Sequence, residues 1–443
     1  MSDRTAKSNS AFLTTLILLG FVAGAVVGQC LYSHYEGAVP LGWIQSLEFV
    51  GNTFFMSLLK MVLVPLVASS VVVGVSSIGD PSKLGFVGMT TVTYYFSTML
   101  LAVTLGVFLV TTIQPGAGID EAFRDAQVAD FDEGQATANQ RVEKAQGTGL
   151  WGAVKNITSQ LIPSNPIASA AQGQLLPVIS FSLILGIVLA VLGAPGQPLL
   201  DLFASLFTAM MKLVEWILWL APVGVFALVA WTVARIGLRS LTGPLSFYVT
   251  TVLVGLAIHG CLVLPTILIV FGKASPWHFF MQMRPALLTA LGTDSSSATL
   301  PVTIECAEGP GGCSRKASQF VLPLGATVNM DGTALYEAVA VVFLFQCFGI
   351  DLGAVELGII VITATLAAVG AAGIPSAGLV TMVIVVEAVN NSLGGSKVLA
   401  VSSIGIILGI DRLLDMCRTV VNVWGDAVGA KLITRIAPDE PSS

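Results

Sequence analysis

Residues 325–341 read GATVNMDGTALYEAVAV and place two acidic side chains inside an apolar run. An aspartate within a membrane span is costly unless it pairs or binds a cation. The oxygens of Asn329 and Asp331, together with backbone carbonyls freed by an unwound turn, are hard ligands that suit Na⁺. Glu337 lies one helical turn beyond Thr333 on the same face, where it is a candidate proton carrier. The alternative role for both acids is a purely structural hydrogen bond.

The composition excludes an ordinary soluble protein. Of the 443 residues, 55% are hydrophobic and 10% are charged, whereas a soluble domain has roughly 25% charged residues. The net charge of -6 is too weak to indicate a nucleic-acid partner. The six cysteines form no CxxC pair and the three histidines are scattered, so no zinc site is predicted. We expect an all-α protein that crosses the lipid bilayer several times.

Long apolar stretches occupy the chain before residue 275, and each is long enough to span a membrane. They are Ala11–Leu31, Ile44–Val75, Phe86–Ile113, Leu176–Leu192, Leu199–Ala234 and Ser246–Phe271. The stretch 199–234 is too long for one straight helix, and we expect Pro222 and Gly224 to break it. Beyond residue 275, polar residues interrupt the apolar runs at four places, which indicates broken helices and re-entrant loops. These interruptions are Thr293–Thr299, Asn329–Thr333, Gly370–Gly378 and Asp411–Asp426.

Residues 276–350 and 354–437 follow one plan, in which an apolar run, a tip of small residues, a second apolar run and a broken helix succeed one another. This plan predicts an inverted repeat of hairpin plus helix. Basic residues near the ends of the spans favour both termini in the cytoplasm and the acidic segment 116–149 outside. These basic residues are Arg4, Lys7, Lys83, Lys431 and Arg435.

Two of the interruptions are rich in small residues. The serines at 295–297 offer hydroxyl groups and, if a helix begins there, backbone N–H groups that favour an anion. An ordinary serine-rich turn is the alternative. Residues 370–378 contain too much glycine for a stable helix and too little polarity for an exposed loop. We interpret them as a flexible flap over a site, with close helix–helix contact as the alternative.

The stretch 411–426 carries charges of both signs at membrane depth. Spacings of four, three, four and four place Asp411, Asp415, Arg418, Asn422 and Asp426 near one helical face. The guanidinium of Arg418 can hold a carboxylate and Asp415 can hold an ammonium group. A molecule with both groups would match the pair. The alternative is an ion pair that these two residues form with each other.

Four motifs in this order resemble the glutamate transporter family, the dicarboxylate/amino acid:cation symporters. The motifs are SSSATLP at 295–301, NMDGTALY at 329–336, AGIPSAG at 372–378 and DMCRTVVNVWGD at 415–426. The resemblance extends over nearly the whole chain. It implies a homotrimer in which each protomer has eight transmembrane helices and two re-entrant hairpins, built from inverted repeats. It also implies an elevator mechanism, in which a transport domain slides along a static scaffold.

The resemblance implies a division of the chain. Residues 1–113 would hold scaffold helices and, as the third helix, the start of the transport domain, and 114–160 an extracellular acidic loop. Residues 161–245 would form scaffold helices for trimerisation. Residues 246–437 would form the transport domain, with two hairpins and two broken helices, and 438–443 a cytoplasmic tail.

The resemblance also implies roles for single residues. Arg418 would bind the substrate's side-chain carboxylate and Asp415 its amino group, while Glu337 matches the position associated with proton cotransport in the animal glutamate carriers. Further substrate contacts would come from Ser295, Ser296, Ser297, Thr333, Ile374, Pro375, Gly378, Thr419 and Asn422, with Ile374–Gly378 as the outer gate. One sodium site would use Gly325, Asn329, Asn422 and Asp426. A second would use Tyr95, Thr98, Asn329 and Asp331, and a third Thr327 with carbonyls near Ala368, Val369 and Ala371.

Three positions depart from the family pattern. Relatives usually carry an arginine just before the serine tip or beside the substrate arginine, and these places hold Asp294 and Met416. Asp294 would oppose an anionic substrate or pair with Arg418 in the empty state. Met99 stands where many relatives have Ser or Thr, so one oxygen of the second sodium site is missing.

These features predict a symporter of the plasma or inner membrane that is not an enzyme. It would carry L-glutamate or L-aspartate with Na⁺ and H⁺ and need no organic cofactor. A C4-dicarboxylate symporter is the nearest alternative, but Asp415 argues against it because such substrates have no ammonium group. An anion channel on the same fold is a second alternative. An intramembrane hydrolase is disfavoured because no histidine lies near the serine tip.

Overall fold

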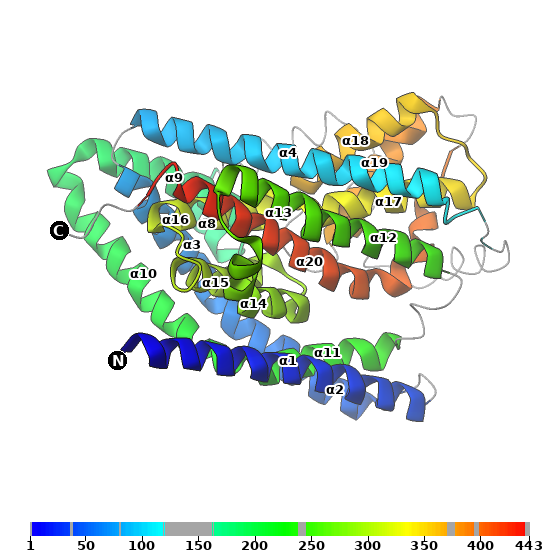
Figure 1. Ribbon diagram of the computed structural model, residues 1–443, viewed down its shortest axis with the longest axis horizontal. Coiled ribbons are helices and arrows are strands. Elements are labelled where there is room, and N and C mark those ends of the chain that lie inside the picture. Colours follow the sequence, from blue (N-terminus) through cyan, green and yellow to red (C-terminus); the bar gives the residue numbers. More distant parts are fainter. Residues whose placement is uncertain are drawn as a thin grey trace.

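The computed structural model describes residues 2–35, 39–78, 81–117, 119, 162, 164–237, 245–369, 377–393 and 398–438, and every regular element in them is a helix (Figure 1). The helices fall into two groups by their packing partners. We call them the wall helices and the site helices. The helix α1 begins, and α20 ends, at the left end of the view in Figure 1.

The wall helices come from the first half of the chain and pack mainly on one another. They are α1 (Ser2–His34), α2 (Leu41–Glu48), the π-helix η1 (Phe49–Phe55), α3 (Met56–Ile78), α8 (Pro166–Ala171), α9 (Leu175–Leu192), η2 (Ala194–Gly196), α10 (Gln197–Leu218) and α11 (Ala221–Ile236). The longest contact joins α1 to α11 along the lower edge of Figure 1.

The site helices come from the second half of the chain, with one addition from the first. The addition is α4 (Pro81–Ile113), which packs on α17 and α18 rather than on its sequence neighbour α3. The others are α12 (Ser246–Ile258), η4 (His259–Val263), α13 (Leu264–Ile267), η5 (Leu268–Gly272), α14 (Pro276–Thr293), α15 (Ser296–Glu308), α16 (Arg315–Val328), α17 (Asp331–Cys347), α18 (Ala354–Val369), α19 (Ala377–Ser392), η6 (Val401–Ile404) and α20 (Gly405–Thr434).

Two hairpins, α14–α15 and α18–α19, occupy the places where the sequence predicts them. Each is followed by a long helical segment, α16–α17 in one case and α20 in the other. Nearly every residue of α17 is buried, which agrees with a sequence that is apolar on all sides except for its acids. The hairpin-and-helix plan therefore occurs twice, and its second copy lies beside the first around α17.

Two sequence predictions about helix breaks have different outcomes. The stretch 199–234 divides as expected, because α10 ends at Leu218 and α11 starts at Ala221 with Pro222 in its first turn. The prediction of a second broken helix at 411–426 is wrong, since α20 runs without interruption from Gly405 to Thr434. The polar residues there pair with one another along α20 or with residues of neighbouring helices, and the backbone of α20 stays helical throughout.

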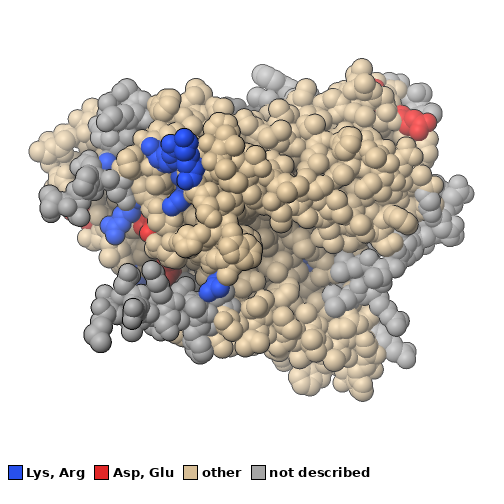
Figure 2. Space-filling model, in the orientation of Figure 1, with Lys and Arg blue, Asp and Glu red and all other residues tan. Residues whose placement is uncertain are grey.

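The described helices fit a membrane. Five of them are long and apolar enough to cross one, at Thr15–His34, Gly85–Ile113, Ala194–Val214, Ser246–Gly272 and Arg315–Cys347. Shorter apolar helices lie at Val64–Val73, Pro177–Leu192, Ala221–Arg235 and Ala354–Val369. Figure 2 shows a broad face with almost no charge, with basic side chains gathered toward its left half. A lipid environment explains why so much apolar surface is exposed.

Candidate functional site

The serine tip lies at the turn between α14 and α15. Asp294 takes a left-handed conformation with φ of 57° and ends α14. Ser295 then caps α15, because its hydroxyl accepts a hydrogen bond from the backbone N–H of Ala298 at 3.1 Å. Ser295, Ser296 and Ser297 are all buried. The tip thus presents the positive end of a thirteen-residue helix to the protein interior, as the sequence predicts.

The break between α16 and α17 is held open by α20. Asn329 and Met330 leave the helical conformation, and α17 starts at Asp331. The backbone N–H of Gly332 donates to Oδ1 of Asn422 at 2.7 Å, and Nδ2 of Asn422 donates to the Thr333 hydroxyl at 3.1 Å. One amide of α20 therefore satisfies both the freed backbone and a polar side chain of the broken segment.

A glycine at 332 is required by close packing. A Cβ atom there would lie 2.5 Å from the backbone oxygen of Arg418, a distance that real structures do not tolerate. The close approach brings the unwound segment directly against α20. This is how residues almost ninety positions apart in the sequence come to share one site.

Arg418 lies at the centre of the site with no exposed surface. Its Nη2 atom is 2.7 Å from Oδ1 of Asp415 and 3.1 Å from Oδ1 of Asp411, and its Nε donates to Oδ1 of Asp415 at 3.1 Å. Its guanidinium carbon lies 3.8 Å from the centroid of the Tyr336 ring. The alternative of an Arg418–Asp415 ion pair is therefore present in this structure, with Asp411 as a second carboxylate.

Nη1 of Arg418 has neither a hydrogen bond nor an ion pair with any described residue, whereas Nη2 lies in the ion pairs with Asp411 and Asp415. It faces the start of α19, where a Cβ on Gly378 would be 3.3 Å from Nη1 and 3.2 Å from the Thr333 methyl group. A buried donor without a partner is costly. Nη1 is thus a donor that an added carboxylate would satisfy. The neighbouring Thr419 is buried as well.

Glu337 lies near Gly378, as Nη1 of Arg418 does, and has no exposed surface. The hydroxyl of Thr381 donates to Oε1 of Glu337, while Oε2 has no partner among the described residues. The sequence predicted the placement of Glu337 beside Thr333 but not the contact with Thr381. That contact joins Glu337 of α17 to the first turns of α19 in the second hairpin.

The residues of the first predicted sodium site lie close together. Nδ2 of Asn329 donates to Oδ1 of Asp426 at 3.0 Å. Gly325 lies so close to this pair that a Cβ on it would be 2.4 Å from the same Asp426 oxygen. Asn422 lies one helical turn before Asp426, but its amide is directed to Gly332 and Thr333.

The second predicted set is only partly assembled. Oγ1 of Thr98 lies 3.4 Å from Oδ1 of Asn329. The Tyr95 hydroxyl donates instead to the backbone oxygen of Val321 at 2.6 Å. Oδ1 of Asp331 is buried without a partner among the described residues. An orphaned carboxylate oxygen beside amide and hydroxyl oxygens fits a hard cation such as Na⁺.

The third predicted set lies at the edge of the described residues. Thr327, Ala368 and Val369 are buried, and the Thr327 hydroxyl donates to the backbone oxygen of Leu324 at 3.0 Å. Ala371, together with Ile374 and Pro375 of the predicted gate, lies outside the described residues.

Two partners of the site were missed by the sequence analysis. Nε2 of His259 lies 3.1 Å from Oδ2 of Asp331, and both side chains are fully buried. Asp294 pairs with Arg412, whose Nε is 2.8 Å from Oδ2 of Asp294. The suggested pairing of Asp294 with Arg418 is therefore wrong in this structure. Because a buried acid needs a partner, the sequence indicated that Asp331 and Asp294 would each have one. It did not indicate that these partners would be His259 and Arg412.

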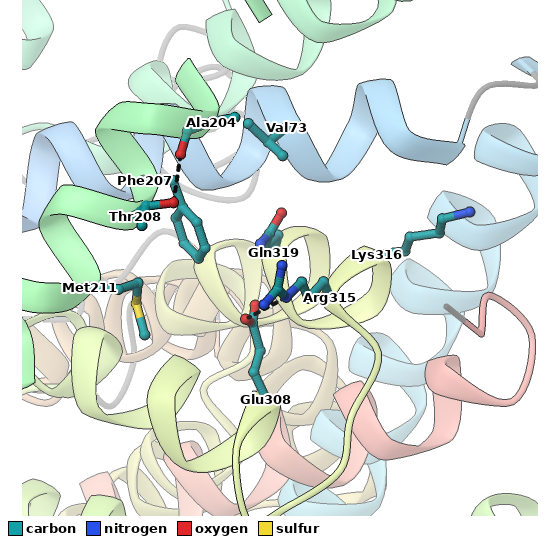
Figure 3. Close-up of a pocket in the computed structure, with 9 residues that line it drawn as sticks. All are labelled: Val73, Ala204, Phe207, Thr208, Met211, Glu308, Arg315, Lys316 and Gln319. Atoms are coloured by element: carbon teal, nitrogen blue, oxygen red, sulfur yellow. Dashed lines mark hydrogen bonds and ion pairs between the residues drawn. The ribbon is translucent and has the colours of Figure 1, made fainter. Parts of the chain in front are cut away.

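A cavity of about 410 Å³ lies apart from this site, between α3 and α10 on one side and α15 and α16 on the other (Figure 3). Its wall-helix side is mostly apolar, with Phe207 and Met211. Its other side carries Glu308, Arg315 and Gln319. None of the predicted substrate or cation residues lines it. It marks a seam between the wall helices and the site helices.

Comparison with known proteins adds to this geometry. The model of the sodium:dicarboxylate symporter family matches residues 13–436. Excitatory amino acid transporter 3 of Oryctolagus cuniculus is 36% identical over 99% of this chain and 88% of its own length. Neutral amino acid transporter B(0) of the same species is 37% identical over 97% and 81%. Putative sodium-dependent excitatory amino acid transporter glt-4 of Caenorhabditis elegans is 35% identical over 99% and 91%.

These matches extend over nearly the whole chain, and described residues of three of the four motifs, Gly332, Gly378 and Asp415, lie against one buried arginine in a helical membrane protein. The chain therefore belongs to the sodium:dicarboxylate symporter family.

Proposed function

We propose that this protein is a secondary active symporter that carries L-glutamate or L-aspartate together with Na⁺. The observation that carries the proposal is Nη1 of the buried Arg418, which has no partner among the described residues and belongs to the guanidinium that pairs with Asp415. The relatives include both excitatory and neutral amino acid transporters at similar identity, so overall similarity does not select the substrate. The Nη1 donor of Arg418 favours an acidic substrate, because it has no partner among the described residues and an added carboxylate would accept its hydrogen bond.

In the proposed complex the substrate divides the Arg418–Asp415 pair. Its side-chain carboxylate binds Nη1 and draws Arg418 toward itself, and its ammonium group takes the released carboxylate of Asp415. Its α-carboxylate would lie near the N-terminus of α15, where Ser295–Ser297 provide donors. Thr333, Thr419 and Asn422 complete the contacts.

Sodium would couple to this step through the broken segment. Asn329 and Asp331 sit where α16 ends and α17 begins, and Asn422 links that segment to the substrate side of α20. A cation held by Asp426 and Asp331 would order the same residues that contact the substrate. Each positive charge that enters with the membrane potential gains about 2.3 kcal/mol per 100 mV. Two or three sodium ions would thus drive an anion against a steep gradient.

A proton would travel on Glu337. An ionised carboxylate without a cationic partner is costly to bury, and Oε2 of Glu337 has no partner among the described residues. Thr381 of the second hairpin donates a hydrogen bond to Glu337, so a change in the protonation of Glu337 would alter this contact with the hairpin.

We further propose an elevator mechanism in a homotrimer. The site helices would form the moving transport domain and the wall helices the static scaffold, which supports the predicted division of the chain, α4 included. The hairpin α14–α15 packs against α1, α3 and α11, whereas α18–α19 packs mainly on site helices. This asymmetry supports the second hairpin as the outer gate. Both termini would lie in the cytoplasm.

A C4-dicarboxylate symporter remains the nearest alternative on this fold. It is disfavoured because Asp415 already neutralises Arg418, and a substrate without an ammonium group would offer Asp415 no cation in exchange for Arg418. The family and its relatives are transporters, which fits a protein that is not an enzyme. Anion conduction without concentrative uptake would require another account of the site.

Binding of L-aspartate to the purified protein, measured by calorimetry with and without Na⁺, tests this function. We expect binding only with Na⁺, and competition by L-glutamate but not by succinate. Arg418→Gln is the matched variant and should lose L-aspartate binding. Binding that is independent of Na⁺, or that is retained in Arg418→Gln, would contradict the proposal.

A further inference from the structure

The ion pair between Asp294 and Arg412 joins the first hairpin to α20 beside the proposed substrate site. Asp294 directly precedes the serine tip and its side chain is fully buried, while the Arg412 side chain is 21% exposed. Their contact at 2.8 Å links the end of α14 to the second turn of α20. The neighbouring Asp411 points to Arg418 instead. Adjacent residues of α20 therefore serve two different partners.

Buried carboxylates outnumber guanidinium groups around the site even with Arg412 counted. Three buried carboxylates, those of Asp294, Asp411 and Asp415, face the two guanidinium groups of Arg412 and Arg418. Asp294 also interacts electrostatically with Asp415 and Arg418. An incoming acidic amino acid would add a further negative charge. Without Arg412, the carboxylate of Asp294, which directly precedes the serine tip, would lack its ion-pair partner.

The position of Arg412 is fixed from the opposite side by a wall helix. Its guanidinium carbon lies 5.6 Å from the centroid of the Trp231 ring of α11. The end of α14 packs tightly there too, since a Cβ on Gly292 would lie 2.8 Å from a methyl group of Val225. Arg412 is thereby held over the indole face while its Nε reaches Asp294.

We propose that Arg412 is a positioning residue for substrate selection, which holds the carboxylate of Asp294 away from Arg418 and so lets the site accept an anionic side chain. This inference rests on the proposed function. Asp294 stands where relatives carry an arginine, and the inference gives this acid a role. Its pairing with Arg412 keeps its negative charge from opposing an anionic substrate. Arg412 does not touch the substrate itself, and its effect passes through Asp294.

The test is a cycle of Arg412→Gln, Asp294→Asn and the double variant in proteoliposomes. The readout is inhibition of labelled L-aspartate uptake by L-asparagine relative to unlabelled L-aspartate, because the two have similar shapes and L-asparagine carries a neutral amide in place of the side-chain carboxylate. A general structural defect would weaken both ligands alike. In Arg412→Gln we expect the preference for L-aspartate to fall about tenfold, as an unscreened buried charge implies. The double variant should return toward the wild-type preference.

Arg235→Gln is the matched control, since Arg235 lies 4.9 Å from the same indole centroid but forms no described ion pair with the hairpin. It should leave the preference unchanged. An unchanged preference in Arg412→Gln would overturn the inference, and so would a double variant as impaired as Arg412→Gln. If Arg412→Gln does not fold, comparison of the double variant with Asp294→Asn decides, because a loss there would mean that Arg412 acts directly on the substrate. Wild-type protein that takes up no acidic amino acid would refute the proposed function, a distinct outcome that removes the inference with it.

Discussion

Replacing Gly325 by alanine tests the first proposed sodium site with a single methyl group. Gly325 belongs to α16, and its added Cβ would lie 2.4 Å from Oδ1 of Asp426 and 2.7 Å from the Tyr95 hydroxyl oxygen. Unstrained contacts between non-bonded heavy atoms lie at roughly 3.5–4.0 Å. The Asp426 carboxylate must therefore move by about 1 Å. That movement would break the 3.0 Å hydrogen bond from Asn329.

The cost follows from these distances. Overpacking of a well-packed interior costs about 1–3 kcal/mol, and loss of a hydrogen bond to a charged group costs about 1.5–3 kcal/mol. If one third of this sum falls on the cation-bound state, sodium affinity drops about tenfold, which corresponds to roughly 1.4 kcal/mol. We expect the Na⁺ concentration for half-maximal L-aspartate uptake to rise by at least that factor.

The matched control is Gly88→Ala in α4, where a Cβ would meet only a ring carbon of Phe320 at 3.8 Å. Both variants place alanine in a helix and gain the same helix propensity, about 0.8–1.0 kcal/mol. Sodium titrations of uptake in proteoliposomes would compare the two with wild type. A Gly325→Ala protein that folds and keeps the wild-type sodium dependence would refute the cation-site assignment of Asp426 and Asn329.

The other predictions concern the charged residues of the same site. Arg418→Ala should abolish uptake of labelled L-glutamate and lower thermal stability, since it leaves buried carboxylates unpaired at a cost of about 3–5 kcal/mol; unchanged glutamate affinity would contradict it. Glu337→Gln keeps an acceptor for Thr381 but cannot carry a proton, so uptake should lose its stimulation by acidic pH; a wild-type pH profile would exclude Glu337 as the carrier. Asp426→Asn should weaken sodium activation about tenfold, and unaltered sodium dependence would argue against its role as a ligand.

The sequence predicted the working half of the molecule well, because its signals are local. Polar residues that interrupt apolar runs predicted the serine tip and the helix break at Asn329–Met330. Helical spacing placed Asp415 and Arg418 within contact, as the 2.7 Å ion pair confirms. Irregular backbone and charged residues are costly within a lipid bilayer. A break or a charge in an apolar run therefore points strongly to a binding site.

The sequence did not predict contacts correctly where a polar residue could find a hydrogen-bond or ion-pair partner in more than one place. The charges at 411–426 suggested a broken helix, but Asp411 and Asp415 pair with Arg418 within α20, Arg412 pairs with Asp294, and the helix stays continuous. His259 lies in an apolar run 72 residues before Asp331, and nothing local indicates that the two meet. Arg412 lies off the polar face that Asp411, Asp415 and Arg418 share, yet it forms an ion pair with Asp294. Such contacts depend on which helices become neighbours, which periodicity in one segment does not determine.

Uptake of labelled L-aspartate into proteoliposomes tests the central claim most directly. It should be measured with an inward Na⁺ gradient, with that gradient dissipated, and with unlabelled L-glutamate, succinate or L-serine as competitors. We expect concentrative uptake that requires the Na⁺ gradient and is blocked by L-glutamate but not by succinate or L-serine. Uptake that ignores Na⁺, or that succinate or L-serine blocks as well as L-glutamate does, would contradict the assignment of Arg418 and Asp415 to an acidic amino acid.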